Sequence, residues 1–271
     1  MENDLNLTPR QQREIDFHVG YAEQQSKDLT LVDDSLITSS QRRWWNQGWS
    51  MWTELLALNL TGKKVMVIGC GSAADCILLA KAGATVSGFD LSVDMINLGQ
   101  TRADREGVKI DLQVMPAEEM NYAERQFDVV LAHDILHHVE IEKTMSEVVR
   151  VSKPNARVVI NEVYTHSGID NIRHSWVVNR FLYKPMKRVV YGKNIPYITP
   201  DERKMNESDM EKVRDKINVD RERFFDLAVN RVLPANVGFI NKMDTALLNS
   251  SNWIGRRLSG RILIVGSTRT D

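Results

Sequence analysis

KVMVIGCGSAADCILLAKAGATVSGFDLS, the stretch from Lys64 to Ser92, decides the fold. It begins with a short apolar run rich in β-branched residues, which is typical of a buried strand. A Gly-x-Gly turn at Gly69 and Gly71 follows at once, and Asp75 to Ala82 reads as a helix. A second short strand then ends at Asp90. This order of strand, glycine turn, helix, strand and acid predicts half of a nucleoside-binding α/β fold.

The turn and the acid have separate chemical uses. Glycines let the backbone pass close to a ligand where a Cβ would collide, and an acid about 20 residues further on is placed to accept hydrogen bonds from ribose hydroxyls. Asp75, in the first turn of the helix, would compete with a pyrophosphate for the helix N-terminus. A cationic cofactor without phosphate, such as S-adenosylmethionine, tolerates that carboxylate better than a dinucleotide does.

Composition sets broad limits on the protein. A chain of 271 residues with 42% hydrophobic and 26% charged residues suits one large α/β domain with a cap, and a net charge of -1 gives no support for nucleic-acid binding. Cys70 and Cys76 flank the tight turn, so we expect neither a disulfide nor a metal pair. Without a membrane-length apolar run or a signal-like N-terminus, the chain is expected in the cytoplasm.

Strands continue to alternate with helices beyond this stretch. Residues 110–114, 127–132 and 157–163 read as strands, which predicts a parallel sheet covered by helices on both faces. Residues 165–248 then read as largely helical with no clear strand, and strand character returns at 261–266. We therefore expect four parts: an N-terminal helical lid or cap (1–58), a cofactor-binding core (59–164), a helical substrate-recognition insertion (165–250) and a final sheet strand (251–271).

Tryptophans are concentrated near the N-terminus. Residues 42–52 hold four of the six, and Trp45, Trp49 and Trp52 fall on one face of a helix. One interpretation is a helix packed on the core by large apolar side chains. The other is a lid over the cofactor, with Tyr21, Arg43 or Trp44 touching the cofactor or substrate. We expect packing to explain at least two of the four.

Four motifs carry a family resemblance: VIGCGS at 67–72, GFDLS at 88–92, PAEEM at 116–120 and FDVVLAHDILHHV at 127–139. Their order and spacing resemble the small-molecule branch of the class I S-adenosylmethionine-dependent methyltransferases, over residues 60–165 plus the last strand. The resemblance implies a Rossmann-like fold with a mainly parallel seven-stranded sheet, helices on both faces, an N-terminal helical lid and a helical insertion before the last strand.

The resemblance also implies roles for individual residues in binding S-adenosylmethionine. The implied cofactor contacts are Gly69, Cys70, Gly71, Asp90, Leu91, Met95, Ala117, Glu118 and His133. Three positions depart from the family pattern. Val67 replaces the acid at the end of the first strand, Ala73 replaces the third glycine, and Pro116 replaces the acid that often accepts from the adenine amino group.

Methyl transfer needs orientation, exclusion of water and sometimes a base for the substrate proton. The candidate catalytic residues are His133, Glu162, Tyr164 and His166, and the candidate substrate contacts are Tyr21, Trp44, His174 and Tyr191. Each histidine has the alternative of a structural or solvent-facing role. The spacing of Glu162, His166 and His174 matches no metal motif, so we expect no metal. The basic stretch 180–193 would grip an anionic substrate, touch a lipid surface or form a solvated amphipathic helix.

The sequence therefore predicts an enzyme that transfers a methyl group from S-adenosylmethionine to oxygen, nitrogen or carbon of a small molecule. One alternative is attack on the aminobutyl chain of the same cofactor, as in a cyclase or aminocarboxypropyl transferase, which releases methylthioadenosine. Another is a non-catalytic protein that keeps the cofactor fold. Acceptor, substrate and oligomeric state stay open.

Overall fold

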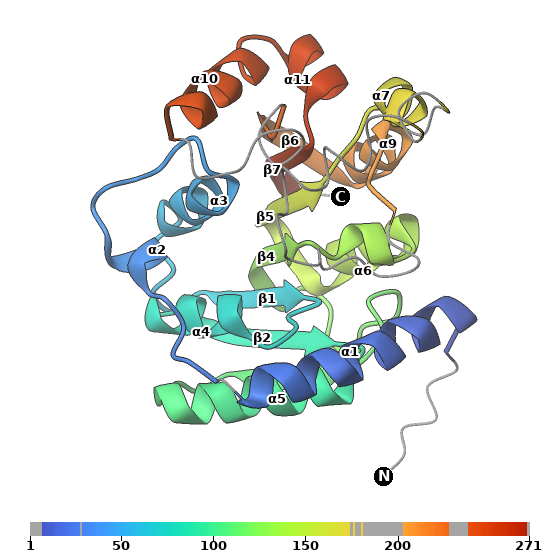
Figure 1. Cartoon of the computed structure of the whole chain (residues 1–271). Coiled ribbons are helices and arrows are strands. Elements are labelled where there is room, and N and C mark those ends of the chain that lie inside the picture. The colour runs from blue at the N-terminus through green and yellow to red at the C-terminus, as the bar shows by residue number, and fades with distance from the viewer. Residues whose placement is uncertain are drawn as a thin grey trace.

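The computed structural model describes residues 7–27, 29–173, 176, 180, 203–227 and 238–269. Its strands form one seven-stranded sheet in the order β3-β2-β1-β4-β5-β7-β6 (Figure 1). The strands are β1 (Lys64–Ile68), β2 (Thr85–Asp90), β3 (Asp111–Val114), β4 (Phe127–His133), β5 (Ser152–Val163), β6 (Ile217–Phe225) and β7 (Arg261–Thr268). β7 runs antiparallel to both its neighbours, and the other pairs are parallel. The predicted seven-stranded, mainly parallel sheet is confirmed.

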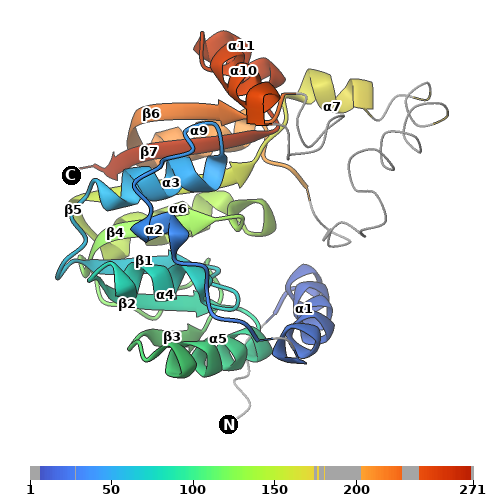
Figure 2. The same ribbon diagram turned by 60° about the vertical axis from the view of Figure 1, so that its left-hand side comes forward.

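Helices cover both faces of the sheet. They are α1 (Pro9–Lys27), α2 (Ser35–Thr38), α3 (Gln47–Leu56), α4 (Ala74–Lys81), α5 (Val93–Glu106), η1 (Leu136–His138, a 3-10 helix), α6 (Ile141–Val151), α7 (Ser167–Arg173), α9 (Glu207–Lys216), α10 (Gly238–Leu248) and α11 (Asn252–Leu258). α3, α4 and α5 share one apolar cluster with one face of the sheet, and α6 and α9 share another with the opposite face. α1 lies beside α5, and α10 and α11 lie beyond β6 (Figures 1 and 2).

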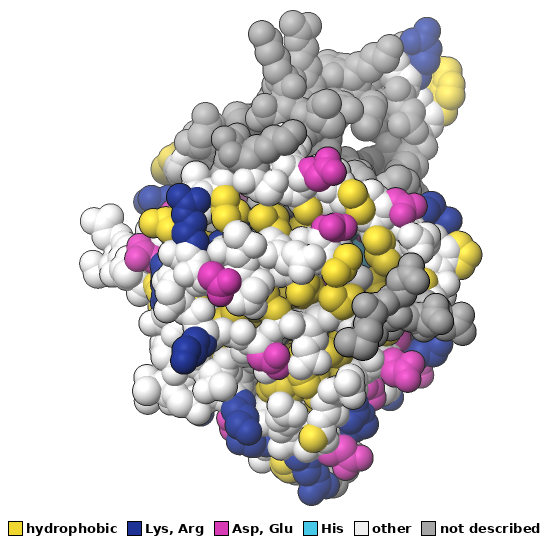
Figure 3. Space-filling model, turned by 90° about the horizontal axis from the view of Figure 1, so that it is seen from below, with side chains coloured by type: hydrophobic (Ala, Val, Ile, Leu, Met, Phe, Trp, Pro, Cys, Tyr) yellow, Lys and Arg dark blue, Asp and Glu magenta, His cyan; other side chains and the backbone are white. Residues whose placement is uncertain are grey.

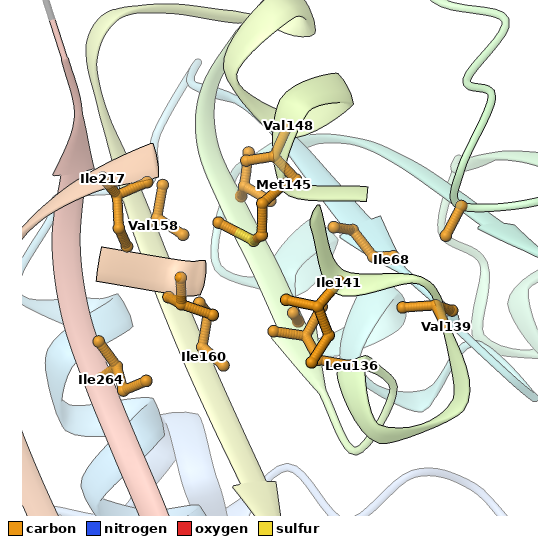
Figure 4. Packing of buried hydrophobic residues seen from close by; sticks show 14 of the residues in the cluster. Ile68, Leu136, Val139, Ile141, Met145, Val148, Val158, Ile160, Ile217 and Ile264 are labelled. Carbon is orange, nitrogen blue, oxygen red and sulfur yellow. The ribbon is translucent and has the colours of Figure 1, made fainter. Parts of the chain in front are cut away.

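Alternating side chains of each central strand enter the two clusters, as the pleat of a strand requires. In β1, Val65 and Val67 face the side of α3 and α4, whereas Met66 and Ile68 face the side of α6. Figure 4 shows Met145 and Val148 of α6 with Ile68 and other strand side chains in the second cluster. Apolar side chains fill the space between the helices and both faces of the sheet, so the edge at the carboxyl ends of the strands is left for polar chemistry.

The expected helical insertion contains a strand. β6 pairs antiparallel with β7 and forms the outer edge of the sheet, so the interpretation of 165–248 as having no clear strand is wrong. Its middle residues are charged (Asp220-Arg221-Glu222-Arg223), which is common on edge strands because charge blocks pairing with another chain. No helix among the described residues combines the length and apolarity needed to cross a bilayer.

The tryptophan helix packs on the sheet, as one of the two interpretations held. α3 begins after Asn46, whose side-chain oxygen accepts from the Trp49 N–H at 3.1 Å. Trp45 therefore precedes the helix. Trp49 and Trp52 are buried, and α3 contacts β5 and β7. Packing accounts for these two tryptophans.

Candidate functional site

The glycine turn is held in a left-handed backbone conformation. Gly69, Gly71 and Ala73 have φ values of 58°, 50° and 60°, and the Cys70 N–H donates to the Phe89 carbonyl at 2.8 Å. Gly69 has a second constraint, since a Cβ there would lie 2.5 Å from two side-chain carbons of Ile135. The positive φ thus favours glycine at 69, and the Ile135 side chain that covers it leaves no room for a Cβ.

Gly69→Ala is expected to lower the free energy of unfolding by about 3 kcal/mol, because it adds left-handed strain to a clash in a packed site. An Ile135→Ala background removes the two side-chain carbons at 2.5 Å and leaves only the residue 135 Cβ, at 2.9 Å. The same substitution should then cost less, about 2 kcal/mol. Gly62→Ala is the matched control, since Gly62 has φ 72° and nothing within 4 Å of a Cβ. Chemical denaturation measures all four variants. An equal cost of Gly69→Ala in both backgrounds would show that Ile135 is not the limiting contact.

Asp90 ties this turn to the end of β2. One carboxylate oxygen accepts from the Gly71 N–H and the other from the Ser92 N–H, both at 2.9 Å. A carboxylate offers about four acceptor sites, so each oxygen keeps one for a ligand. The side chain lines a cavity at this edge, where it presents that remaining capacity.

The cavity has a volume of about 420 Å³, within the range of small-molecule sites, roughly 300–1,000 Å³. Leu91, Met95, Met115, Ala117 and Val139 give it apolar walls. Among the described residues that line it, none is Lys or Arg, so nothing there neutralises a pyrophosphate. Figure 3 shows the molecule from below the view of Figure 1, with apolar side chains across the middle of the face drawn there and Lys and Arg mostly toward its edge. The lining fits a phosphate-free nucleoside with a polar tail.

α1 forms one wall of the cavity with Gln11, Glu14, Ile15 and His18. Polar contacts hold this helix to the domain. Gln11 donates to the Glu118 carboxylate at 3.3 Å, the Arg10 guanidinium to the His137 carbonyl at 2.7 Å, and Glu14 pairs with the His138 imidazole at 3.0 Å. α1 lies across the carboxyl ends of the strands on the β2 side (Figures 1 and 2). It therefore closes part of the cavity without belonging to the apolar core of the sheet.

His133 occupies the end of β4 in a network of charges. Its Nδ1 lies 2.8 Å from an Asp75 oxygen, and its Nε2 lies 3.7 Å from Asp134. Burial lowers the pKa of His133, but Asp75 and Asp134 outweigh it, and the net pKa lies above 6.5. Arg261 holds Asp134 with two contacts of 2.8 and 2.9 Å. Although burial opposes it, this guanidinium lowers the pKa of Asp134.

Comparison with known proteins agrees with this geometry. Residues 66–160 match a family model described as a methyltransferase domain. A ubiquinone biosynthesis O-methyltransferase from Rhizobium leguminosarum bv. trifolii is 33% identical over 102 residues, which are 37% of this chain and 40% of that protein. The predicted resemblance to the class I S-adenosylmethionine-dependent methyltransferases is thus confirmed over residues 66–160. The chain spans about two fifths of the length of the curated relatives it matches.

Two solved structures share the fold over nearly the whole chain, including the segments on either side of residues 66–160. Geranyl diphosphate C-methyltransferase from Streptomyces coelicolor, in complex with Mg²⁺, geranyl diphosphate and S-adenosyl-L-homocysteine, superposes with a TM-score of 0.61 at 14% identity, covering 97% of this chain and 99% of that one. The cyclase SpnF gives 0.60 at 15% identity and covers 97% of both chains. At these identities the two structures show the fold alone.

Most of the expected cofactor contacts lie together in the methyltransferase domain. Gly69, Gly71, Asp90, Leu91, Met95, Ala117, Glu118 and His133 all line the cavity. Cys70 lies between two of them, but its side chain is buried beside Cys76. A hydrogen bond with Cys76 and burial raise the pKa of the Cys70 thiol, and both cysteines are free. Any contact at position 70 would come from its backbone.

Glu162 is fully buried behind the methyltransferase cavity, on β5. One carboxylate oxygen accepts from the Ile135 and Leu136 N–H groups at 2.7 and 2.6 Å, and the other lies 2.7 Å from the His137 Nδ1. A role on a substrate proton is not supported by this position. Glu162 instead fixes the turn that places Ile135 over Gly69. Asp134, His137 and Glu162 are residue types that can bind a metal ion, and their potential ligand atoms lie close together. These atoms already bind protein groups.

Tyr164 and His166 lie apart from the cofactor cavity. Both line a second cavity of about 340 Å³ between α9 and α11. The Tyr164 hydroxyl donates to the Arg256 carbonyl at 2.8 Å, and His166 lies 3.7 Å from Glu207. The structure thus separates them from His133, against the expectation of one catalytic group. Burial raises the pKa of Tyr164 to about 12, so its hydroxyl stays protonated.

The expected substrate contacts are not brought together in the described residues. Trp44 is exposed near β6, where its carbonyl accepts from Arg223, and it does not line the cavity. His174 and Tyr191 lie outside the described residues, as does the side chain of Tyr21 on α1. Of the four, only Trp44 has a described side chain, and it lies away from the cavity.

The sequence predicted an N-terminal helical lid over residues 1–58, but it did not identify the α1 residues that line the cavity. Gln11, Glu14, Ile15 and His18 follow the i, i+3, i+4, i+7 spacing of one helix face, but three of the four are polar. A search for apolar periodicity overlooks such a face, whereas the spacing itself would have found it. From the sequence, Asp75 was considered only as a competitor of phosphate at the helix N-terminus. Its pairing with His133 could not be predicted, because it depends on the end of β4 lying beside the start of α4.

Proposed function

We propose that this chain is an S-adenosylmethionine-dependent methyltransferase acting on a small molecule. The observation that carries the proposal is one cavity in which Gly71, Asp90, an apolar wall and His133 meet without a Lys or Arg among the described lining residues. Asp90 would hold the ribose hydroxyls through its spare acceptor sites. Leu91, Met95 and Ala117 would contact the adenine. When bound, the cofactor supplies a methyl carbon bonded to a sulfonium, and attack by the acceptor returns the C–S electron pair to sulfur.

His133 is suited to accept the proton of a hydroxyl or amine acceptor. Asp75, as a carboxylate, only accepts, so it fixes the proton of the neutral imidazole on Nδ1 and leaves Nε2 as the base. The Asp75 carboxylate would then stabilise the imidazolium that forms. This arrangement supports transfer to oxygen or nitrogen.

The α1 wall would exclude water from the reacting atoms. Its described contacts with the domain are mainly polar, apart from a small cluster of Ala22, Met95 and Leu98. A helix held in this way opens at a lower free energy than a core helix. It can therefore admit cofactor and close over it.

Protonation of His133 sets the pH dependence of binding. The pKa of His133 is raised in the folded protein. At low pH the imidazole is therefore protonated, and its positive charge repels a cationic cofactor in the same cavity. As the pH rises through this raised pKa, the imidazole becomes neutral and the repulsion disappears. S-adenosylhomocysteine has no charge on its sulfur and serves as the reference. The affinity for S-adenosylmethionine, relative to that for S-adenosylhomocysteine, should thus increase with pH by about tenfold. Calorimetric titration of both ligands across this range measures it.

His18 and His138 also line the cavity, so a His133→Gln variant is the control for that titration. The change in affinity ratio should disappear in this variant while binding of S-adenosylhomocysteine persists. An unchanged pH dependence would assign the effect to another group.

Product analysis tests the reaction itself. The purified protein is incubated with S-adenosylmethionine alone and with cell extract, and the nucleosides are identified by mass spectrometry. S-adenosylhomocysteine that forms only with extract supports methyl transfer. Methylthioadenosine without extract, above a no-enzyme blank, would contradict methyl transfer and indicate attack on the aminobutyl chain. Cofactor binding without either product would indicate a non-catalytic protein.

A further inference from the structure

α10 and α11 carry an exposed apolar surface. Phe239, Met243 and Leu247 lie on one face of α10 at i, i+4 and i+8, with 72%, 60% and 49% of each residue exposed, and Trp253 of α11 is 64% exposed. These are four of the nine large apolar residues that are exposed in the described part of the chain. Isolated exposed apolar side chains are ordinary, but a helical stripe of them marks an interaction site.

The exposed charged side chains of the same two helices are all positive. Residues 238–258 contain Lys242, Arg256 and Arg257, and their one acid is Asp244. Asp244 is buried, where its carboxylate accepts from the Leu227 N–H at 2.8 Å. Arg256 pairs with Glu222 of β6, yet its side chain stays 47% exposed. The accessible charge of α10 and α11 is therefore positive, although the whole chain is near neutral.

The position of this pair suits contact with an extended surface. α10 and α11 pack on β6 and on each other, and they form the outermost layer beyond that edge strand (Figures 1 and 2). Arg257 stacks its guanidinium over the Trp253 ring at 4.8 Å, and Lys242 lies 4.4 Å from the Trp45 ring. An aromatic or aliphatic side chain beside a cation is the pairing found where proteins lie on headgroups.

We propose that the α10–α11 surface, made of these four apolar and three cationic residues, docks the enzyme on the surface of an anionic lipid bilayer. The apolar residues enter the boundary between headgroups and acyl chains, and the cations contact lipid phosphates. Glu207 and Glu211 of α9 line the second cavity with Arg256 and Arg257. α10 and α11 themselves expose no acid, so charge complementarity favours an anionic bilayer over a protein partner as the occupant of their outer face. The proposal does not depend on methyl transfer.

Vesicle sedimentation tests it with the full chain. The probes are vesicles of phosphatidylcholine and of an equimolar mixture with phosphatidylglycerol. Wild-type protein should sediment with the anionic vesicles, much less with the neutral ones, and less in high salt. The Phe239→Ser/Met243→Ser double variant should lose binding by about tenfold or more, and Arg257→Glu should weaken binding to anionic vesicles only.

Leu31→Ser is the matched control, because Leu31 is 62% exposed outside this surface. It should bind vesicles as the wild type does. Circular dichroism melts and S-adenosylhomocysteine binding should be unchanged in every variant, since the substituted side chains are exposed and lie outside the cofactor cavity. Equal binding to neutral and anionic vesicles, no binding, or an equal loss in Leu31→Ser would overturn the proposal. So would a wild-type dimer in analytical ultracentrifugation that the double variant converts to a monomer, since the stripe would then be a protein interface.

Discussion

Asp90→Ala is expected to reduce the affinity for S-adenosylhomocysteine by about a hundredfold or more. The substitution removes the carboxylate proposed to bind the ribose hydroxyls and also releases the Gly71 and Ser92 N–H groups. Hydrogen bonds to a charged group contribute about 1.5–3 kcal/mol each, and a hundredfold corresponds to about 2.7 kcal/mol. Isothermal titration calorimetry measures the change.

The control for Asp90 is Asp111→Ala. Asp111 begins β3 at the opposite, amino end of the sheet, so its removal should leave the affinity within about twofold of wild type. Asp90→Asn should fall between the two, since an amide keeps one acceptor oxygen. Wild-type affinity in Asp90→Ala would place the cofactor elsewhere.

Glu162→Ala is expected to lower the free energy of unfolding by about 3–5 kcal/mol, the cost of breaking a buried charged pair. It leaves the Ile135 and Leu136 N–H groups and the His137 imidazole without their acceptor, and Leu136 and His137 are buried. Glu162→Gln should cost less, because its amide oxygen can still accept from both N–H groups. Urea denaturation followed by circular dichroism measures both.

Glu140→Ala is the exposed counterpart, with a side chain 63% accessible, and should change stability little. A Glu162→Ala protein as stable as wild type but without activity would contradict the structural role. It would return Glu162 to the candidates for catalysis.

The cofactor-binding part of the fold could be predicted from short-range features of the sequence. The glycine turn, the strands around it and Asp90 are encoded within Lys64–Ser92, where each feature depends on near neighbours in sequence. β6 was missed because an edge strand needs little apolar alternation, and charged residues in its middle resemble a helix surface.

The catalytic side was less predictable because it depends on packing between distant segments. Glu162 was correctly placed near the carboxyl end of β5, but only the fold of η1 shows that backbone and His137 groups occupy its oxygens. Tyr164 and His166 follow it closely in sequence, yet α9 and α11 enclose them in a different cavity. Proximity in sequence beyond a strand end does not determine which cavity a side chain enters.

The most direct measurement is a crystal structure of the protein with S-adenosylhomocysteine. We expect the ribose hydroxyls on Asp90, the adenine between Leu91, Met95 and Ala117, the thioether sulfur on the His133 side of the cavity, and α1 closed over the ligand. Ligand density away from the glycine turn, or a ribose without contact to Asp90, would contradict the assignment of this cavity as the methyl-donor site.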